Sequence, residues 1–305
     1  MRSPMTYGHV GALASFCLTA VMWPSLNAAA TTLSLDGSAG LLSAPEVKIL
    51  PTVAGSITHN FKNIVPGSGD RSATGDIFVK AGVVRLTADT SAIMGSPSLG
   101  NIQTVLSGTW EDTLTFNAPG DLPGFPGIEI IEGITDGVAN LNILLTGSIA
   151  AEGPSEFFSS YKARLSYGPG GSANRVELFG EIDSGFVSGS ILPGLLSLEV
   201  FFTYGVPFDI KFTLDGRARL GWEGNAPEDM FASVLLGESA TWDGVGNVRA
   251  MVPDGEGGLM TIDLPESTWS ATSSTIDYTM PIPEPGTLTL LLSGLVLLTT
   301  LRRRR

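Results

Sequence analysis

The sequence predicts an all-β protein whose body is an antiparallel, jelly-roll-like β-sandwich. Apolar and polar residues alternate with a period of two in many short stretches, as in residues 113–116 and 211–214, and this alternation is typical of half-buried strands. No stretch of the body has a long amphipathic helical period. The 38 glycines and 19 prolines separate the strand-like stretches, and turn signals at intervals of about 8–12 residues indicate a sandwich or a barrel.

Residues 1–30 have the pattern of a signal peptide. Arg2 provides a positive start, residues 10–23 are mostly apolar and uncharged, and three alanines end at Ala30, after which we predict cleavage. An N-terminal transmembrane helix is the alternative, but the apolar stretch is short and no basic residues follow it to stop transfer. We therefore expect export by Sec-type machinery.

Residues 31–280 are expected to form the sandwich as one domain, with two smaller domains as the alternative. Residues 161–167 and 175–182 flank a segment rich in Gly and Pro, which is a hairpin signal. Further strands are expected at residues 56–61, 76–79, 84–88, 102–110, 113–116, 143–150, 196–204, 211–214, 232–236, 260–264 and 275–280.

The body is strongly acidic. Five of the 17 Lys and Arg lie in the two terminal segments, and of the 30 Asp and Glu only Glu284 does. The body therefore carries 12 cationic and 29 acidic side chains, a formal net charge of −17. Such a surface repels nucleic acid, which we exclude as a partner, and suits cations or simply solubility.

The sequence contains few residues suited to catalysis, and we predict no catalytic residue and no enzyme. His59 is the body's one histidine, its cysteine content is zero once Cys17 leaves with the signal peptide, and no serine lies in a G-x-S-x-G motif. A structural zinc site cannot be closed with these residues. A pair of carboxylates could still hydrolyse a glycosidic bond, and the pairs close in sequence are Glu129/Glu132, Glu152/Glu156 and Glu228/Asp229.

We predict no cofactor, with calcium as the alternative. Oxygen-rich loops can bind this hard cation, and the weak candidates are Asp243, Asn247, Asp254 and Glu256. Neither of their loops fits the EF-hand pattern, and we favour the interpretation that they are hairpin turns, where Gly and Asn tolerate positive φ.

Four tryptophans remain in the body, at positions 110, 222, 242 and 269. Each lies beside polar or acidic residues, so an exposed platform that stacks on sugar rings is one interpretation. Burial in the core of a sandwich is the interpretation that we favour.

The last 25 residues combine three signals in a fixed order: the tripeptide Pro283, Glu284 and Pro285, an uncharged apolar run over residues 287–301, and four terminal arginines. The run would span about 22 Å as a helix, which is short for a permanent membrane anchor. The arginines would remain on the cytoplasmic side. The residues predicted to lie in or beside the membrane are Leu288, Leu290, Leu291, Leu292, Leu295, Val296, Leu297, Leu298, Arg302, Arg303, Arg304 and Arg305.

This tail, residues 281–305, resembles the PEP-CTERM sorting signal of Gram-negative bacteria. The resemblance implies that an exosortase, a membrane protease-transpeptidase, cleaves at Pro283–Pro285. It also implies that the body enters the periplasm while transiently anchored in the inner membrane, and that it ends at the cell surface or in the extracellular matrix.

Residues 108–116, 204–219 and 238–247 further resemble the β-sandwich bodies often joined to this tail, with Asp243 and Gly246 matching a hairpin turn of those bodies. We therefore expect a non-enzymatic surface or matrix protein, with the export machinery and an exosortase as partners and exopolysaccharide as a further candidate. The alternatives are a calcium-dependent or carbohydrate-binding adhesin and, third, a secreted carbohydrate-active enzyme.

Overall fold

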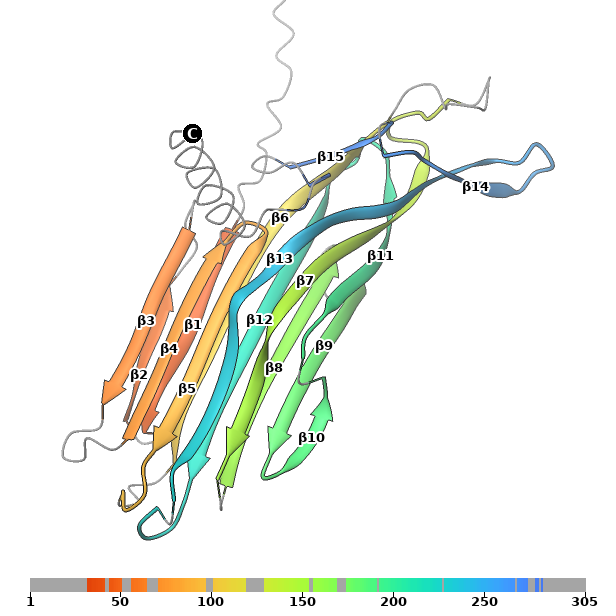
Figure 1. Ribbon diagram of the computed structural model, residues 1–305. Helices are drawn as coiled ribbons and strands as arrows, with labels where there is room; N and C mark the ends of the chain where they lie inside the picture. The colour runs from red at the N-terminus through yellow and green to blue at the C-terminus, as the bar shows by residue number, and fades with distance from the viewer. Residues whose placement is uncertain are drawn as a thin grey trace, which may run out of the picture.

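The computed structural model shows two antiparallel β-sheets packed face to face (Figure 1). It describes residues 32–41, 44–50, 56–64, 71–96, 101–118, 129–153, 156–168, 174–190, 192–226, 228–266, 268–273, 278–279 and 281. All strand pairings among these residues are antiparallel, and none of the residues is helical. The predicted all-β antiparallel sandwich is therefore confirmed.

The larger sheet contains eight of the described strands. In spatial order they are β10 (Phe186–Gly189), β9 (Asn174–Asp183), β8 (Glu156–Tyr167), β12 (Phe208–Gly221), β6 (Ile102–Asn117), β1 (Thr32–Leu41) and β2 (Ala44–Leu50), with β15 (Ser270–Thr272) paired to the end of β6.

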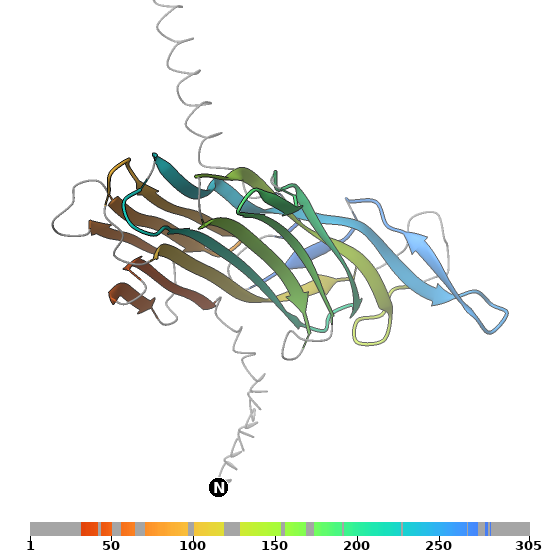
Figure 2. The same cartoon turned by 90° about the horizontal axis from the view of Figure 1, so that it is seen from below.

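The smaller sheet contains seven of the described strands. In spatial order they are β11 (Leu195–Thr203), β7 (Asp136–Glu152), β13 (Met230–Pro253), β5 (Val83–Ala92), β4 (Arg71–Lys80) and β3 (Ser56–Ile64), with β14 (Leu259–Asp263) paired to β13. Figure 2 shows the two layers and the long β13 that extends beyond them.

The chain crosses repeatedly from one sheet to the other. It changes sheet between β2 and β3, at each connection from β5 to β8, at each connection from β10 to β13, and between β14 and β15. Strands that are neighbours in a sheet are therefore often distant in sequence, as β6 and β12 are. Crossing of this kind is typical of β-sandwiches with Greek-key connections.

Strand β6 shows how the sequence forms the core. Its 16 residues alternate without interruption between buried and half-buried positions, because successive side chains point to opposite faces of a sheet. Its inner residues are mostly apolar, and they pack with the inner residues of β4, β5, β12 and β13 in one hydrophobic core. The outer residues of β6 are mainly Thr, Ser, Gln and Glu, which can face solvent.

Two glycines allow close approach in this core. A β-carbon on Gly216 of β12 would overlap the side chain of Leu86 on the opposite sheet. Gly147 of β7 has φ = 131°, and a β-carbon there would overlap the carbonyl oxygen of Leu235, where the β7–β13 pairing shifts register. Both positions exclude a larger residue for steric reasons, and at Gly147 the backbone conformation excludes it as well.

Most predicted strands lie within observed ones. The predicted hairpin around residues 168–174 is the β8–β9 pair, and residues 254–258 form the turn between β13 and β14, where the Asp254 amide donates to the Gly258 carbonyl. The two strands expected at 102–110 and 113–116 are one continuous strand, β6.

Two local predictions are wrong. Asp243 and Gly246 do not form a hairpin turn; they lie inside β13, where the pairing with β7 shifts register on both sides of residues 244–246. The strand expected at residues 275–280 is described only at Tyr278 and Thr279, which are in a turn. Tyr278 is buried, as an inward residue of a strand would be. Its burial comes from packing against Trp110 and Trp242, since Tyr278 itself lies in a turn.

Candidate functional site

The residues predicted for processing and membrane anchoring lie outside the described residues. These are Ala30, Pro283, Glu284, Pro285, Leu288, Leu290, Leu291, Leu292, Leu295, Val296, Leu297, Leu298 and Arg302 to Arg305. Within the described part of the chain, no helix is long and apolar enough to cross a membrane.

The four tryptophans of the body lie in the core and form no exposed platform. Trp110 and Trp242 are fully buried, and Trp222 and Trp269 are 6% and 8% exposed. The indole N–H of Trp222 donates to the Ser96 carbonyl at 3.1 Å, and that of Trp242 donates to the Tyr278 carbonyl at 3.0 Å. A sugar-binding surface of this protein would therefore have to use other side chains.

The four weak calcium candidates are divided between two places. Asp243 and Asn247 are exposed on the irregular part of β13, where Asn247 has φ = 51°. Asp254 and Glu256 lie in the β13–β14 turn, and one carboxylate oxygen of Asp254 accepts the backbone N–H groups of Glu256 and Gly258, both at 2.8 Å. These hydrogen bonds lower the pKa of Asp254 and explain its place in the turn. The described residues contain no group of three or more His, Cys, Asp or Glu placed to hold a metal ion.

The carboxylate pairs considered for glycoside hydrolysis are all at the surface. Each member of Glu129/Glu132, Glu152/Glu156 and Glu228/Asp229 is exposed. Asp112, in contrast, is 4% exposed, and it accepts the hydroxyl of Tyr278 at 2.7 Å. His59 is half-buried on β3, where the edge of its ring contacts Phe61.

Among the described residues, most of the ion pairs lie on the outer face of the larger sheet. Six of the twelve Lys and Arg of the body lie there: Lys162, Arg164, Arg175, Lys211, Arg217 and Arg219. They alternate with inward apolar residues on β8, β9 and β12, so the register of three neighbouring strands gathers them on one surface.

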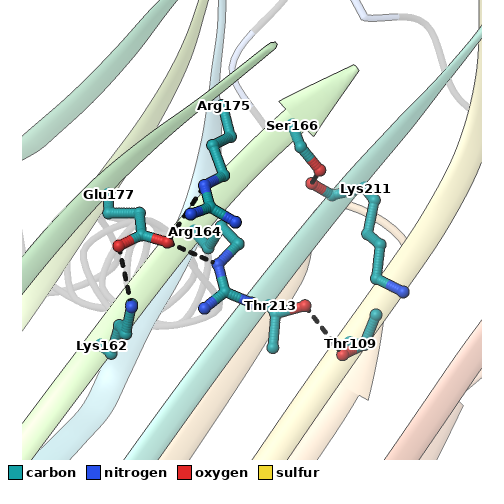
Figure 3. Close-up of polar contacts among 8 residues, drawn as sticks. All are labelled: Thr109, Lys162, Arg164, Ser166, Arg175, Glu177, Lys211 and Thr213. Carbon is teal, nitrogen blue, oxygen red and sulfur yellow. Dashed lines mark hydrogen bonds and ion pairs between the residues drawn. The ribbon is translucent and has the colours of Figure 1, made fainter. Parts of the chain in front are cut away.

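Glu177 is the centre of the group that we call the Glu177 cluster: Lys162, Arg164, Arg175 and Glu177 (Figure 3). Glu177 lies directly opposite Arg164 in the β8–β9 pair. Its carboxylate is 2.8 Å from Nζ of Lys162, 2.8 Å from Nε of Arg164 and 3.5 Å from Nε of Arg175. Hydrogen bonds from Lys162 and Arg164 lower the pKa of Glu177 to about 2, so it stays ionised at any ordinary pH.

The cluster has a surplus of positive charge. Three cations share one carboxylate, which leaves a formal charge of +2 in a body whose net charge is −17. The side chains of Lys162 and Arg175 are 41% and 52% exposed. Their unused N–H donors are therefore available to an anionic ligand from solvent.

Hydroxyl and mixed polar pairs extend this surface across the sheet. Next to Arg164, Thr213 of β12 and Thr109 of β6 share a hydrogen bond of 3.1 Å (Figure 3). Ser107 donates to Asp215 at 2.6 Å, and Lys211 pairs with Glu111. The guanidinium of Arg217 lies 5.3 Å from the ring centre of Phe158. The result is a broad face of donors and acceptors suited to an extended polar chain.

The Glu177 cluster was absent from the sequence predictions, although two signals pointed to it. Lys162 and Arg164 are two residues apart on one predicted strand, and Arg175 and Glu177 are two apart on its hairpin partner, so each pair shares a face. The contacts themselves depend on the hairpin register, which the Gly-rich connection does not determine.

The comparison with protein families finds the PEP-CTERM protein-sorting motif at residues 281–305. The chain therefore carries the C-terminal signal of an exported protein that an exosortase processes. Among curated proteins, none matches the chain significantly. The family assignment thus covers the tail, and the role of the body is argued from its own residues.

Proposed function

We propose that this chain is a non-enzymatic surface or matrix protein, processed by an exosortase, whose body binds acidic exopolysaccharide through the Glu177 cluster and the outer face of the larger sheet. The sorting motif at residues 281–305 is the observation that supports export and processing. The surplus charge of the Glu177 cluster is the observation that supports an anionic polymer as the ligand.

The shape of the face fits a polymer better than a small molecule. It is formed by regular, adjacent strands, so its donors repeat along and across the sheet, and each single contact is exposed and weak. An extended polysaccharide gains affinity from many such contacts at once, and fixed carboxylates on its sugars would pair with Lys162, Arg164 and Arg175.

A non-enzymatic role is supported by the surroundings of the carboxylates. Both members of each candidate pair are exposed, whereas the general acid of a glycosidase is held in an apolar pocket. The buried Asp112 is engaged by the Tyr278 hydroxyl and by the amide of Thr113 at 2.8 Å, and this arrangement serves the fold.

Binding to polymers of defined charge tests the proposal. The body, residues 31–282, is passed over an immobilised polyuronate and over dextran. We expect retention by the polyuronate alone, with an affinity that falls as salt rises, because the contacts are ionic. Replacing Lys162 and Arg175 together by Ala should abolish retention.

Two variants separate the cluster from general charge effects. Glu177→Gln raises the formal charge of the cluster from +2 to +3, so it should strengthen binding, although it removes three ion pairs. Lys80→Ala removes an exposed cation from the other sheet and should leave binding unchanged. The proposal would be contradicted if Lys80→Ala lost as much polyuronate binding as the variant with Lys162 and Arg175 replaced by Ala. It would also be contradicted if dextran retained the body as strongly as the polyuronate does.

A further inference from the structure

The segment just before the sorting motif is built into the body. Its first part, β15, pairs with residues Thr115 to Asn117 at the end of β6. Tyr278 then turns inward, its amide donates to the Ala271 carbonyl at 3.1 Å, and its side chain is fully buried. The chain is thus attached to the body at β15 and again at Tyr278.

Tyr278 contacts both sheets. Its hydroxyl donates to Asp112 of β6 at 2.7 Å, and its carbonyl accepts the indole N–H of Trp242 on β13 at 3.0 Å. Its ring stacks on that of Trp110, with 6.2 Å between the ring centroids, and meets the ring of Trp242 edge-on, with 4.7 Å between the centroids. These four contacts join Tyr278 to β6 and to β13, and we call them the C-terminal clamp.

Both ends of the folded body leave it at the same level of β6. Thr32, the first residue of β1, pairs with Glu111, and Tyr278 binds the adjacent Asp112. Beyond the clamp, a β-carbon on Gly244 of β13 would lie 3.6 Å from the Thr279 carbonyl oxygen and 3.7 Å from Cδ of Pro281. The exposed Asp243 is next to this exit.

The tether to the apolar run of the tail is short. Six peptide units separate Pro281 from Thr287, where the apolar run of the tail begins. Fully extended, this length reaches at most about 20 Å. The exit beside Gly244 must therefore remain within about 20 Å of a membrane that holds the tail.

We propose that Tyr278 is a positioning residue for sorting: the C-terminal clamp holds the Asp243–Gly244 edge of the sandwich at the membrane surface while the sorting motif is processed. This inference rests on the proposed membrane insertion of the tail. Loss of the clamp removes the contacts that join Tyr278 to both sheets, and the nine residues after β15 up to Pro281, if fully extended, would add up to about 30 Å of reach.

Quenching by lipids tests this orientation in the full chain. The chain is expressed in a host without an exosortase, with Cys17 replaced by Ser and a single label site, Asp243→Cys or Glu223→Cys. Glu223 is exposed and follows β12 near Leu220, which pairs with Ile102, about 33 Å along β6 from Asp112. In vesicles with nitroxide-labelled headgroups, the fluorescence of a fluorophore attached at position 243 should be quenched severalfold more strongly than that of one attached at position 223.

Three further variants separate positioning from folding. Tyr278→Ala should remove the difference between the two sites, and Tyr278→Phe, which keeps the ring, should retain most of it. A ten-residue Gly-Ser insertion after Pro281 should also remove the difference while leaving the melting temperature of the body unchanged.

Each outcome has a definite meaning. Equal quenching at the two sites in the otherwise unchanged, vesicle-bound chain would overturn the proposal, as would an undiminished difference after the insertion. Flotation is measured separately. A full chain that fails to float with the vesicles would refute the membrane insertion of the tail, and the positioning role would fall with it.

Discussion

The hydrogen bond between Tyr278 and Asp112 gives a quantitative prediction for stability. Tyr278→Phe removes one hydroxyl and keeps the ring among Trp110 and Trp242. It leaves an oxygen of Asp112 without this donor at a site that solvent does not reach, since Asp112 is 4% exposed and Tyr278 fully buried. Loss of a hydrogen bond to a buried polar group costs about 1–3 kcal/mol, so we expect the free energy of unfolding to fall by that amount.

A double-mutant cycle isolates this interaction. The free energies of unfolding of Tyr278→Phe, Asp112→Ala and the double variant are measured by urea denaturation of residues 31–282. The double variant should be less destabilised than the sum of the single variants, by about 1–3 kcal/mol, because the contact can be lost only once. A coupling energy within about 0.5 kcal/mol of zero would refute the hydrogen bond as a stabilising contact.

The same cycle should depend on pH in the alkaline range. Burial, and then the charge of Asp112, raise the pKa of Tyr278 well above its ordinary value. Above about pH 10 the unfolded chain loses the phenolic proton while the folded chain keeps it, so stability falls as pH rises. Tyr278→Phe should reduce this alkaline loss, which repeated denaturation between pH 8 and pH 11 would reveal.

Three other predictions concern the body. The pKa of Glu177 is lowered from 4.5 to about 2, so its contribution to stability is present above pH 4.5 and is lost as pH falls toward 2. The melting temperature of Glu177→Gln should therefore depend less on pH in that range than the melting temperature of the unchanged body. The same pH dependence in both would argue against the cluster. Gly147→Ala should lower the free energy of unfolding by about 2 kcal/mol or more, because its β-carbon would overlap the Leu235 carbonyl at positive φ, whereas the control Gly194→Ala, with open space, should have little effect. Millimolar calcium should leave the melting temperature unchanged, and a rise that disappears in Asp243→Ala or Asp254→Ala would instead favour a calcium-dependent adhesin.

The strands that sequence analysis predicted are those with large inner residues. In β6 the inward positions include Leu106, Trp110 and Leu114, so the alternation is visible. In β1 the inward residues Leu33 and Leu35 are followed by the small residues Gly37 and Ala39, and a β-carbon on Gly37 would overlap Phe61 of the facing sheet and Leu106 of β6. Small residues carry a weak hydrophobic signal, and β1 was therefore missed.

Long-range packing explains the other differences. β13 is a single strand of 24 residues, but its register shifts disturb the period of two and resembled turns in the sequence. The C-terminal clamp joins Tyr278 to Asp112, 166 residues away, and no local pattern predicts such a contact. The sorting tail, in contrast, was predictable because it is read as a linear signal and needs no tertiary structure.

Processing at the sorting motif is the central claim, and intact mass measurement of the exported protein tests it most directly. In a host with an exosortase, the chain should lose Arg302 to Arg305 together with the apolar run. The Glu284→Ala chain should remain as a membrane-bound precursor that retains them. If Glu284→Ala still yields mature protein of the same C-terminal boundary, the tripeptide is not the processing signal and the account is contradicted.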